Sequence, residues 1–461
     1  MKWNEEVFRM YDIRGISEVD IDEDFAYKLG LAYGLYVGGN GNVSVGGDVR
    51  LTTEKYKRAL IEGLRDSGLN VIDIGIVPTP LMYFSLFHLD LIGGIQVTAS
   101  HNPKEYNGFK IAIGKETIYG EQIQKLKEIM KSNLVKSKIR GNYQTLNITQ
   151  MYIDFIKKKF QFQKNFNIVV DTGNGVVGPI IKDIFEALNI KFKGIFIEPD
   201  GSFPNHLPDP TVVNYMKWAI DEVKSNKYDG AFGYDGDGDR IGVVDEKGNL
   251  VFGDKITAII SKGIIKKYKN PKIILDVKCS KGVVEYIEKL GGEVILYKTG
   301  HSLMKAKLKE LNSPLAGEMS GHIFIKDDFF GYDDAIYSSL RFLKEIEISN
   351  KSFYENFEEI PFYYSTPEIR VEVEPESKKF EIVNEMVRIF KEKKFNVIDI
   401  DGARIEFDDG FILIRASNTQ PVLVLRFEAK TKEKLDYYQN LLYDELKKFK
   451  NFVKVPWFIH L

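Results

Sequence analysis

The feature that most constrains the fold is a repeated order of short apolar strand, polar loop and helix. Three such openings occur along the chain, with predicted strands over residues 43–47, 168–171 and 273–276. Each strand is followed by small and polar residues and then by a helical pattern. Short apolar strands that alternate with helices predict parallel, doubly wound α/β layers. The three openings suggest a triplicated α/β unit, which is a hypothesis because the identity among them is slight.

The character of the sequence changes after Pro367. Strands are predicted over 369–373, 397–400, 405–407, 411–415 and 422–427, with helices over 378–391 and 432–449. Consecutive strands without helices between them predict an antiparallel sheet, so this part is expected to be a smaller α+β domain. With a further boundary in the polar passage 131–149, the expected domains are residues 1–150, 151–252, 253–365 and 366–461.

Length and charge exclude several classes of protein. The chain has 461 residues, with 64 Lys and Arg against 66 Asp and Glu, and a formal net charge of −2. A nearly neutral chain has no general attraction to nucleic acid or to an anionic membrane, so any anion site must be local. No apolar stretch predicts a membrane span, the polar start indicates no secretory signal, and the single cysteine fits a reducing compartment. A cytoplasmic location is therefore expected.

One predicted strand ends in residues that suit group transfer. The apolar run 94–97 breaks into the sequence Thr-Ala-Ser-His-Asn-Pro, which contains Ser100 and His101, and Lys110 lies on the expected return strand 109–113. Open α/β sheets place their ligands at the carboxyl ends of strands. A hydroxyl, an imidazole and an ammonium there suit acyl or phosphoryl transfer. The alternative is that Ser100 only caps a turn and that His101 is an ordinary loop residue.

A second loop has the pattern of a metal site. Asp235, Asp237 and Asp239 alternate with glycines and are followed by Arg240. Three carboxylates in one short loop would repel one another without a cation, and oxygen ligands favour a hard ion. Three protein ligands leave positions free on Mg²⁺ for a phosphate oxygen. A solvated acidic turn is the alternative interpretation.

Further loops carry weaker signals. Glu318 and Ser320 offer a carboxylate and a hydroxyl two residues apart, suited to neighbouring sugar hydroxyls, and a second loop contains His301. The loop 415–419 combines a guanidinium, two hydroxyls and an amide, which suits a phosphate group. Hydrogen-bonded turns and a polar hairpin tip are the alternatives for these loops. Near the start, Arg14 suits either a phosphate clamp or an ordinary surface ion pair.

Taken together, these motifs resemble those of one family. They occur in order along the whole chain, at residues 11–15, 98–110, 235–240, 278, 300–301, 317–322 and 415–419. In this order they resemble the α-D-phosphohexomutases, specifically the phosphoglucomutase/phosphomannomutase branch. The resemblance implies three related mixed α/β domains and a smaller C-terminal α+β domain, in a heart-shaped molecule with a central cleft.

The resemblance also implies a role for each motif. Ser100 would be carried as phosphoserine, and one Mg²⁺ would be held by Asp235, Asp237, Asp239 and a phosphoserine oxygen. The residues expected around the transferring phosphoryl group are Arg14, Lys110, Arg240 and His322. The residues expected to bind the sugar phosphate are His101, Lys278, His301, Glu318, Ser320, Arg415, Ser417, Asn418 and Thr419, with Arg426 as an addition. Among these, Glu318 and Ser320 would bind the 3- and 4-hydroxyls.

The implied reaction interconverts hexose 1-phosphate and hexose 6-phosphate, with glucose and mannose as the sugars. It would proceed through a hexose 1,6-bisphosphate, with glucose 1,6-bisphosphate as activator or intermediate. Met319 is the form associated with this dual specificity, whereas phosphoglucosamine mutases more often have glutamine there. The alternatives are a phosphoglucosamine mutase, a Mg²⁺-dependent phosphatase or bisphosphate synthase, and a non-catalytic sugar-phosphate sensor. Hexose phosphates are the expected partners, and the chain is expected to be a monomer or a homodimer.

Overall fold

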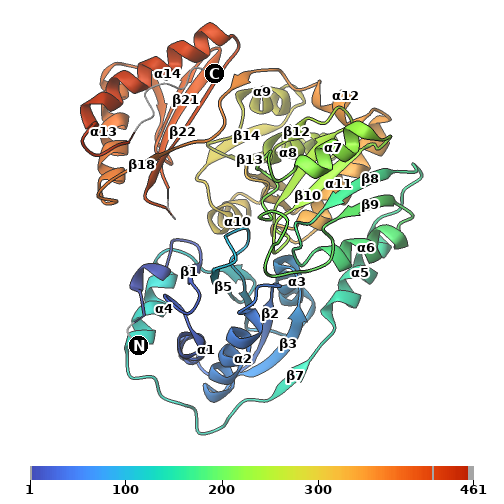
Figure 1. The fold of residues 1–461 in the computed structure, drawn as a ribbon, viewed down its shortest axis with the longest axis vertical. Coiled ribbons are helices and arrows are strands. Elements are labelled where there is room, and N and C mark those ends of the chain that lie inside the picture. The colour runs from blue at the N-terminus through green and yellow to red at the C-terminus, as the bar shows by residue number, and fades with distance from the viewer. Residues whose placement is uncertain (1–2, 418–419, 455–461) are drawn as a thin grey trace.

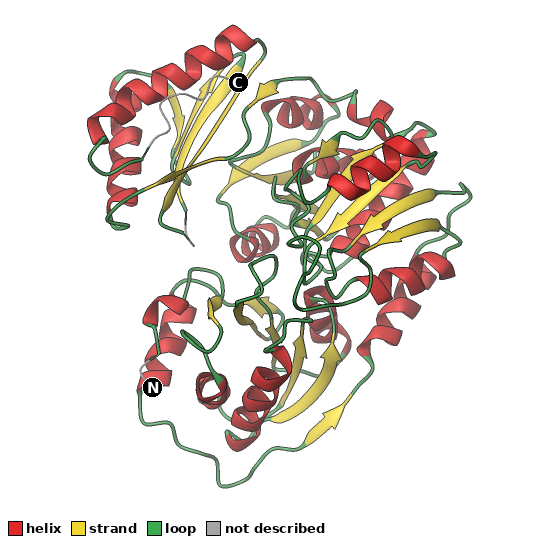
Figure 2. Cartoon of the chain, viewed as in Figure 1, coloured by secondary structure: helices red, strands yellow, loops and turns green. Residues whose placement is uncertain are grey.

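Four α/β units follow one another along the chain in the computed structural model, which describes residues 3–417 and 420–454. Figure 1 shows them as an arc, from the blue first unit through the green second and yellow third units to the red fourth unit. Each unit has its own sheet, and helices pack against the sheets (Figure 2). Among the described residues, no helix is both long and apolar enough to cross a membrane.

The first unit is built on a mixed sheet in the order β1-β5-β4-β2-β3-β7. Its strands are β1 (Ile13–Ile16), β2 (Asn42–Gly47), β3 (Asn70–Ile76), β4 (Gly93–Val97), β5 (Tyr106–Ile113), β6 (Glu116–Thr117) and β7 (Tyr143–Thr145). Its helices are α1 (Glu23–Val37), α2 (Thr53–Asp66), α3 (Thr79–His88) and α4 (Glu121–Lys131), after a 3₁₀ turn at Glu5–Val7.

The prediction of a parallel layer is correct for the centre of this sheet and wrong at one side. Strand β2 is parallel to β3 and β4, whereas β5 is antiparallel to both β4 and β1. The physical reason is the short connection between β4 and β5. Eight residues are too few for the helical crossover that a parallel partner requires, so the chain returns as a hairpin.

The second and third units repeat this arrangement. The second unit contains α5 (Ile148–Lys159), β8 (Asn167–Asp171), α6 (Gly178–Ala187), β9 (Lys191–Ile195), α7 (Lys217–Ser225), β10 (Gly230–Tyr234), β11 (Ile241–Asp245) and β12 (Leu250–Val251). The third contains α8 (Gly253–Lys267), β13 (Lys272–Asp276), α9 (Lys281–Lys289), β14 (Glu293–Tyr297), α10 (His301–Glu310), β15 (Leu315–Gly317), β16 (Ile323–Ile325), α11 (Ala335–Ser349) and α12 (Phe353–Phe357).

Three parallel strands followed by an antiparallel return strand are common to all three units. The orders are β3-β2-β4-β5, β9-β8-β10-β11 and β14-β13-β15-β16. The first three strands of each set are parallel, and the fourth forms a hairpin with the third. The predicted relation among three mixed α/β domains is therefore confirmed. It also makes the hairpin loops equivalent in position, which determines where the candidate site lies.

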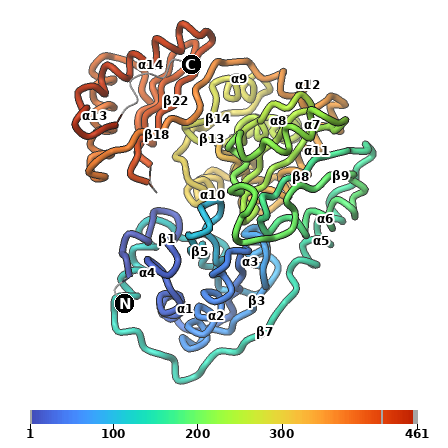
Figure 3. The backbone as a smooth tube through the Cα atoms, viewed as in Figure 1, coloured from blue at the N-terminus to red at the C-terminus, as the bar shows by residue number. Residues whose placement is uncertain are grey.

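The fourth unit is a purely antiparallel sheet in the order β17-β22-β21-β20-β19, with β18 also paired to β22, as the sequence predicts. Its elements are β17 (Tyr364–Ser365), β18 (Ile369–Glu372), α13 (Lys378–Glu392), β19 (Asn396–Ile398), β20 (Ala403–Phe407), β21 (Gly410–Ala416), β22 (Val422–Ala429) and α14 (Lys432–Leu446), with a closing 3₁₀ turn at Lys447–Phe449. The tube in Figure 3 shows this unit at the end of the arc.

The hydrophobic cores join the first three units more closely than the fourth. One continuous cluster of buried residues extends from Ile72 on β3 to Ile360 after α12, and so passes through the first three units. The first unit has in addition a separate core that includes Phe25 of α1 and Leu60 of α2. The fourth unit has a separate core between its sheet and its two long helices. A small cluster of Val277, Phe411 and Leu413 lies between the third and fourth units. Burial of apolar area therefore fixes the first three units as one body.

Candidate active site

The equivalent hairpin loops of the first three units meet at one place. Ser100 lies between β4 and β5, the aspartate loop 235–240 lies between β10 and β11, and the loop 318–322 lies between β15 and β16. Ser100 Oγ donates a hydrogen bond to Asp235 Oδ2 at 2.6 Å. Arg240 Nε, from the aspartate loop, donates to Nε2 of His322 in the third loop at 2.9 Å. The fold therefore brings together three predicted motifs that are far apart in the sequence.

Ser100 is held in an unusual backbone conformation. Its φ is 50°, in the left-handed region that few residues other than glycine adopt, and the residue is only 2% exposed. Its amide donates to Thr98 Oγ1 at 2.9 Å, and Oγ lies 3.0 Å from His101 Nδ1. Burial, together with the charge of Arg240, holds the pKa of His101 well below its ordinary value. His101 is therefore a neutral ring beside the serine hydroxyl.

The three aspartates form a buried cluster that fits a divalent cation. Asp235, Asp237 and Asp239 are fully buried, and each presents an oxygen within 4.8 Å of those of the others. Oδ1 of Asp237 and Oδ1 of Asp239 have no hydrogen-bond partner among the described residues. Burial and the neighbouring carboxylates raise the pKa of Asp235 well above its ordinary value. Buried oxygen ligands with unused lone pairs are what a hard cation requires.

Lys110 supplies a positive charge to the same cluster from β5. Its Nζ donates to Asp237 Oδ2 at 2.6 Å and also to Asp239 Oδ2. Burial lowers the pKa of Lys110, but the two carboxylates raise it more, so that it lies above its ordinary value. Lys110 is therefore charged, as expected for a group that stabilises negative charge.

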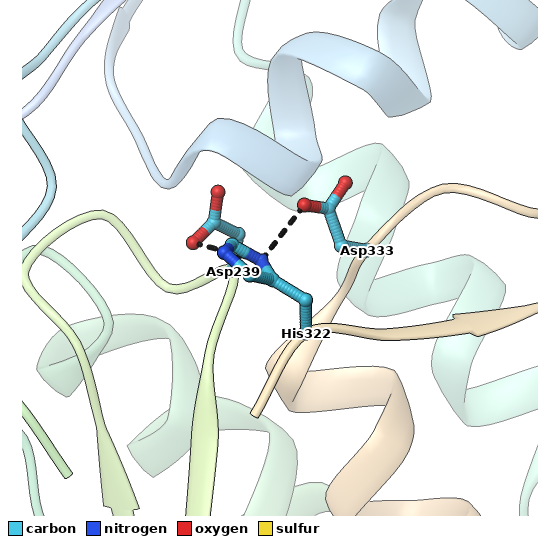
Figure 4. Close-up of side chains that lie close together, drawn as sticks. All are labelled: Asp239, His322 and Asp333. Atoms are coloured by element: carbon cyan, nitrogen blue, oxygen red, sulfur yellow. Dashed lines mark ion pairs between the residues drawn. The ribbon is translucent and has the colours of Figure 1, made fainter. Parts of the chain in front are cut away.

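His322, Asp239 and Asp333 form a second cluster, shown in Figure 4. His322 Nδ1 lies 3.0 Å from Asp333 Oδ2 and 3.6 Å from Asp239 Oδ1. A guanidinium only donates hydrogen bonds, so Nε2 of His322 must accept from Arg240, and the ring proton must lie on Nδ1. This proton occupies the lone pair that a metal would need. The second cluster is therefore a relay of close polar contacts beside the first one, in which Arg240 hydrogen-bonds to His322 and the two carboxylates lie at ion-pair distance from His322 Nδ1.

Two residues of this relay were not predicted from the sequence. Lys305 Nζ donates to Asp333 Oδ1 at 2.9 Å and lies 3.1 Å from His301 Nδ1. Lys305 follows His301 by four residues on α10, so helical spacing places both on one face and could have indicated Lys305. Asp333 directly precedes the N-cap of α11, and no sequence pattern distinguishes its role from capping.

The third unit provides a polar wall next to this relay. Ser320 Oγ donates to Glu318 Oε2 at 3.0 Å, and Glu318 Oε1 accepts from the amide of Gly300 at 3.0 Å. Burial raises the pKa of Glu318. Burial lowers the pKa of Lys278, but Glu368 at 3.4 Å and Asp276 at 3.9 Å raise it more, so that this lysine is firmly protonated.

Two arginines extend the site: Arg415 lies on β21 of the fourth unit, and Arg14 lies on β1 of the first unit. Arg415 Nε donates to Asp401 Oδ2 at 3.0 Å, and the same oxygen accepts from the amide of Thr299 in the third unit. Arg14 Nη1 donates to Oδ1 of Asn102, in the serine loop, at 2.6 Å.

Of the remaining polar residues of the predicted phosphate loop, the structure describes only Ser417. Ser417 Oγ accepts from the amide of Gln420 at 3.2 Å. Asn418 and Thr419 lie outside the described residues. Arg426, which was added to this group, donates to the carbonyl of Lys278 and pairs with Glu428 at 3.2 Å. It therefore lies at the contact between the third and fourth units.

Comparison with known proteins connects this geometry to a family. Sequence profiles of the Phosphoglucomutase/phosphomannomutase alpha/beta/alpha domains I, II and III match residues 5–136, 150–248 and 252–363, and that of its C-terminal domain matches residues 368–445. The chain belongs to the phosphoglucomutase/phosphomannomutase family. This membership confirms the predicted family and fold class, and with them a mutase of the isomerase class.

Individual members of the family resemble the chain over nearly its whole length. A Pseudomonas syringae phosphomannomutase/phosphoglucomutase is 41% identical, over 98% of this chain and 97% of its own. A Neisseria gonorrhoeae phosphoglucomutase is 36% identical, over 94% and 95%. The crystal structure of a phosphoglucomutase/phosphomannomutase family protein from Burkholderia thailandensis superposes with a TM-score of 0.91 at 36% identity, over 97% of this chain and 98% of the other.

Proposed function

We propose that this chain interconverts the 1-phosphates and 6-phosphates of glucose and mannose, through phosphorylated Ser100 and a hexose 1,6-bisphosphate. The observation that carries the proposal is the 2.6 Å contact between Ser100 Oγ and Asp235 in a buried cluster of three aspartates and a charged lysine. A nucleophilic hydroxyl next to a cation site suits phosphoryl transfer. The names of the Pseudomonas and Neisseria relatives support glucose and mannose as the sugars.

In the proposed transfer, the bond between phosphorus and Ser100 Oγ breaks as a bond forms to a sugar hydroxyl oxygen. His322 Nε2 takes the proton of that hydroxyl after it releases the hydrogen bond that it accepts from Arg240 Nε in this structure. The proton that His322 has accepted is then passed on to the seryl oxygen, which leaves the ring neutral again, so that atoms and charge balance over the step. Lys110, Arg14 and Arg240 offset the negative charge on the phosphoryl oxygens. The second transfer runs the same steps in reverse at the other end of the sugar.

The aspartate cluster is the proposed Mg²⁺ site, completed by an oxygen of the phosphoserine. When bound, the ion would supply Lewis-acid stabilisation of the phosphoryl group. Asp235, Asp237 and Asp239 fit this role because they are fully buried and two of their oxygens have no partner among the described residues.

The proposed substrate contacts come from the first, third and fourth units. Glu318 and Ser320 would bind the 3- and 4-hydroxyls, and the residues proposed to hold the sugar phosphate are His101, Lys278, His301, Arg415, Ser417, Asn418 and Thr419. One phosphate site and one transfer site can serve both ends of the sugar if the bisphosphate turns over between steps. Neither Glu318 nor Ser320 would contact the 2-hydroxyl, at which glucose and mannose differ, so both sugars should react.

The fourth unit is proposed to close over the substrate and exclude water, which would otherwise hydrolyse the phosphoserine. Its separate core supports such movement. We further propose domains at residues 1–150, 151–252, 253–365 and 366–461, a cytoplasmic location, and a monomer or homodimer without nucleic-acid or membrane partners. Glucose 1,6-bisphosphate is the proposed activator because it would phosphorylate Ser100.

A coupled assay tests the proposed reaction. Glucose 1-phosphate, mannose 1-phosphate and glucosamine 1-phosphate are supplied in parallel, with Mg²⁺ and a trace of glucose 1,6-bisphosphate. Comparable turnover of the first two is the expected result. Turnover of glucosamine 1-phosphate alone would keep the mechanism and overturn the sugar assignment. Release of free phosphate, accumulation of bisphosphate, or binding without turnover would instead support the phosphatase, the synthase or the sensor.

A further inference from the structure

A buried arginine that the mechanism does not use holds the backbone of the serine loop. The Arg50 guanidinium donates to the carbonyl oxygens of three residues of that loop and of Tyr106, the first residue of β5, and Arg50 is only 3% exposed. Nη2 donates to Ser100 O at 2.8 Å and to Asn102 O at 2.5 Å. Nη1 donates to Pro103 O at 2.7 Å and to Tyr106 O at 2.9 Å. A planar guanidinium can satisfy carbonyls on two sides at once, which a lysine ammonium cannot reproduce.

Asp48 fixes the other side of this arginine. Asp48 Oδ2 lies 3.2 Å from Arg50 Nε, and Oδ1 accepts from the Arg50 amide at 2.9 Å. The same carboxylate accepts from the hydroxyls of Thr53 at 2.8 Å and Thr98 at 2.7 Å. Asp48 is 1% exposed, so this pair is shielded from solvent. Arg50 is therefore anchored to the end of β2, to the start of α2 and to the residue that binds the Ser100 amide.

Arg50 also contacts the second unit, which supplies the aspartate loop. Its guanidinium lies 5.2 Å from the centre of the Phe203 ring, and its backbone forms a bridge to Gly201. Gly236 of the aspartate loop also approaches the serine carbonyl, because a Cβ there would come within 2.6 Å of Ser100 O. The Ser100 carbonyl therefore contacts both Arg50 and the aspartate loop.

We infer that Arg50 is a positioning residue for phosphoryl transfer: it directs Ser100 Oγ at the aspartate cluster by fixing the carbonyl of the same residue. The φ of 50° at Ser100 needs such support, because a serine gains nothing from this conformation by itself. The inference rests on the proposed function of Ser100. It predicts that Arg50 acts on the transfer step and not on sugar-phosphate binding.

The test measures phosphorylation and turnover separately in Arg50→Lys and Arg50→Met. Intact mass follows phosphorylation of Ser100 by glucose 1,6-bisphosphate with Mg²⁺, and the coupled assay gives kcat and KM for glucose 1-phosphate. We expect phosphorylation and kcat to fall about 100-fold in both variants, because a small misplacement of a nucleophile has effects of that order. We expect KM to change less than about 3-fold, since the side chains proposed to bind the sugar phosphate are unchanged. Arg50→Lys keeps the positive charge, so a loss of rate in this variant reports the loss of the guanidinium hydrogen bonds and not the loss of charge.

Arg341→Lys is the matched control, because Arg341 is also buried at 7% exposure and pairs with Asp327 and Asp328 away from the site. Rates are normalised to the folded fraction, and the control should retain kcat. Folded Arg50→Lys with kcat within about 3-fold of the parent would overturn the inference. If neither Arg50 variant folds, Asp48→Asn decides, with an expected loss of kcat of about 10-fold and no loss as the contrary result. A parent chain that is never phosphorylated at Ser100 would instead overturn the proposed function.

Discussion

Two equivalent loops, after the central strand β2 of the first unit and after the central strand β13 of the third, are held in opposite ways. In the first unit the loop after β2 supplies the donor, because Arg50 in this loop donates hydrogen bonds to carbonyls of the neighbouring serine loop. In the third unit the loop after β13 instead supplies the acceptors, and the donors come from the fourth unit. The carbonyls of Val277 and Cys279 each accept from Arg404 of the fourth unit at 2.7 Å. The carbonyl of Lys278 accepts from Arg426 of the same unit.

This difference coincides with the way the units are joined. One hydrophobic cluster passes through the first three units, beside a separate core of the first unit, whereas in the part of the chain that the structure describes the fourth unit shares no large cluster with the others. The fourth unit meets the third through the small cluster of Val277, Phe411 and Leu413 and through polar groups. Ser280 Oγ donates to Glu428 Oε1 at 2.5 Å, and Lys281 Nζ pairs with Glu406 at 2.9 Å. Polar and charged groups can form hydrogen bonds to water when two units separate, whereas exposed apolar area cannot. The transfer site is thus fixed, while the Lys278 loop depends on the position of the fourth unit.

The largest expected effect comes from Ser100→Ala, on the fixed side of this comparison. Loss of the nucleophile should lower kcat at least about 1,000-fold, because no other hydroxyl occupies its place. Binding of glucose 6-phosphate should stay within about 3-fold of the parent by calorimetry, since all the proposed substrate contacts other than His101 lie on other loops. Ser225→Ala, which changes an exposed serine at the end of α7 in the second unit, is the control and should retain activity. Full turnover in Ser100→Ala would contradict the mechanism.

A smaller effect of a different kind is expected from Arg404→Met, at the contact between the fourth unit and the Lys278 loop. Without the two hydrogen bonds to the Lys278 loop, KM for glucose 1-phosphate should rise about 10-fold, with a smaller change in kcat. Arg388→Met removes an exposed arginine from α13 of the same unit and should leave both constants unchanged. If Arg404→Met instead lowers kcat and leaves KM unchanged, the two loops do not differ as described.

The smallest effect is a pH dependence at the same contact. The charge of Lys278 lowers the pKa of Glu368 to about 2, below its ordinary value of about 4.5. A lowered pKa stabilises the folded state above the ordinary pKa, and this stability is lost as pH falls from about 4.5 to about 2. Glu368→Gln should therefore cost about 1–2 kcal/mol at pH 6 and progressively less toward pH 3. Thermal unfolding of both proteins at each pH measures the difference, and a constant difference would contradict this origin.

Motifs that are local in the sequence were predictable, and contacts made by the backbone were not. The alternating aspartates and glycines predict a metal site, and the serine after an apolar strand predicts group transfer, each from a few neighbouring residues. The antiparallel strands of the fourth unit were likewise predictable from consecutive strands without helices. By contrast, Arg50 and Arg404 bind carbonyl oxygens, which every residue has, so no side-chain pattern marks their partners. The role of Asp333 is equally hard to predict, because it stands next to Asp334, an ordinary helix cap, and two aspartates before a helix suggest capping alone.

The central claim, that Ser100 carries the phosphoryl group between sugar phosphates, is tested most directly by the mass of the intact protein. The chain is incubated with glucose 1,6-bisphosphate and Mg²⁺, freed of small molecules, weighed, and then exposed to glucose 1-phosphate. The account predicts a gain of one phosphoryl group, on Ser100, and its loss on the second incubation as glucose 1,6-bisphosphate is formed again, with no gain in Ser100→Ala. A parent chain that gains no phosphoryl group, or gains it on another residue, would contradict the account.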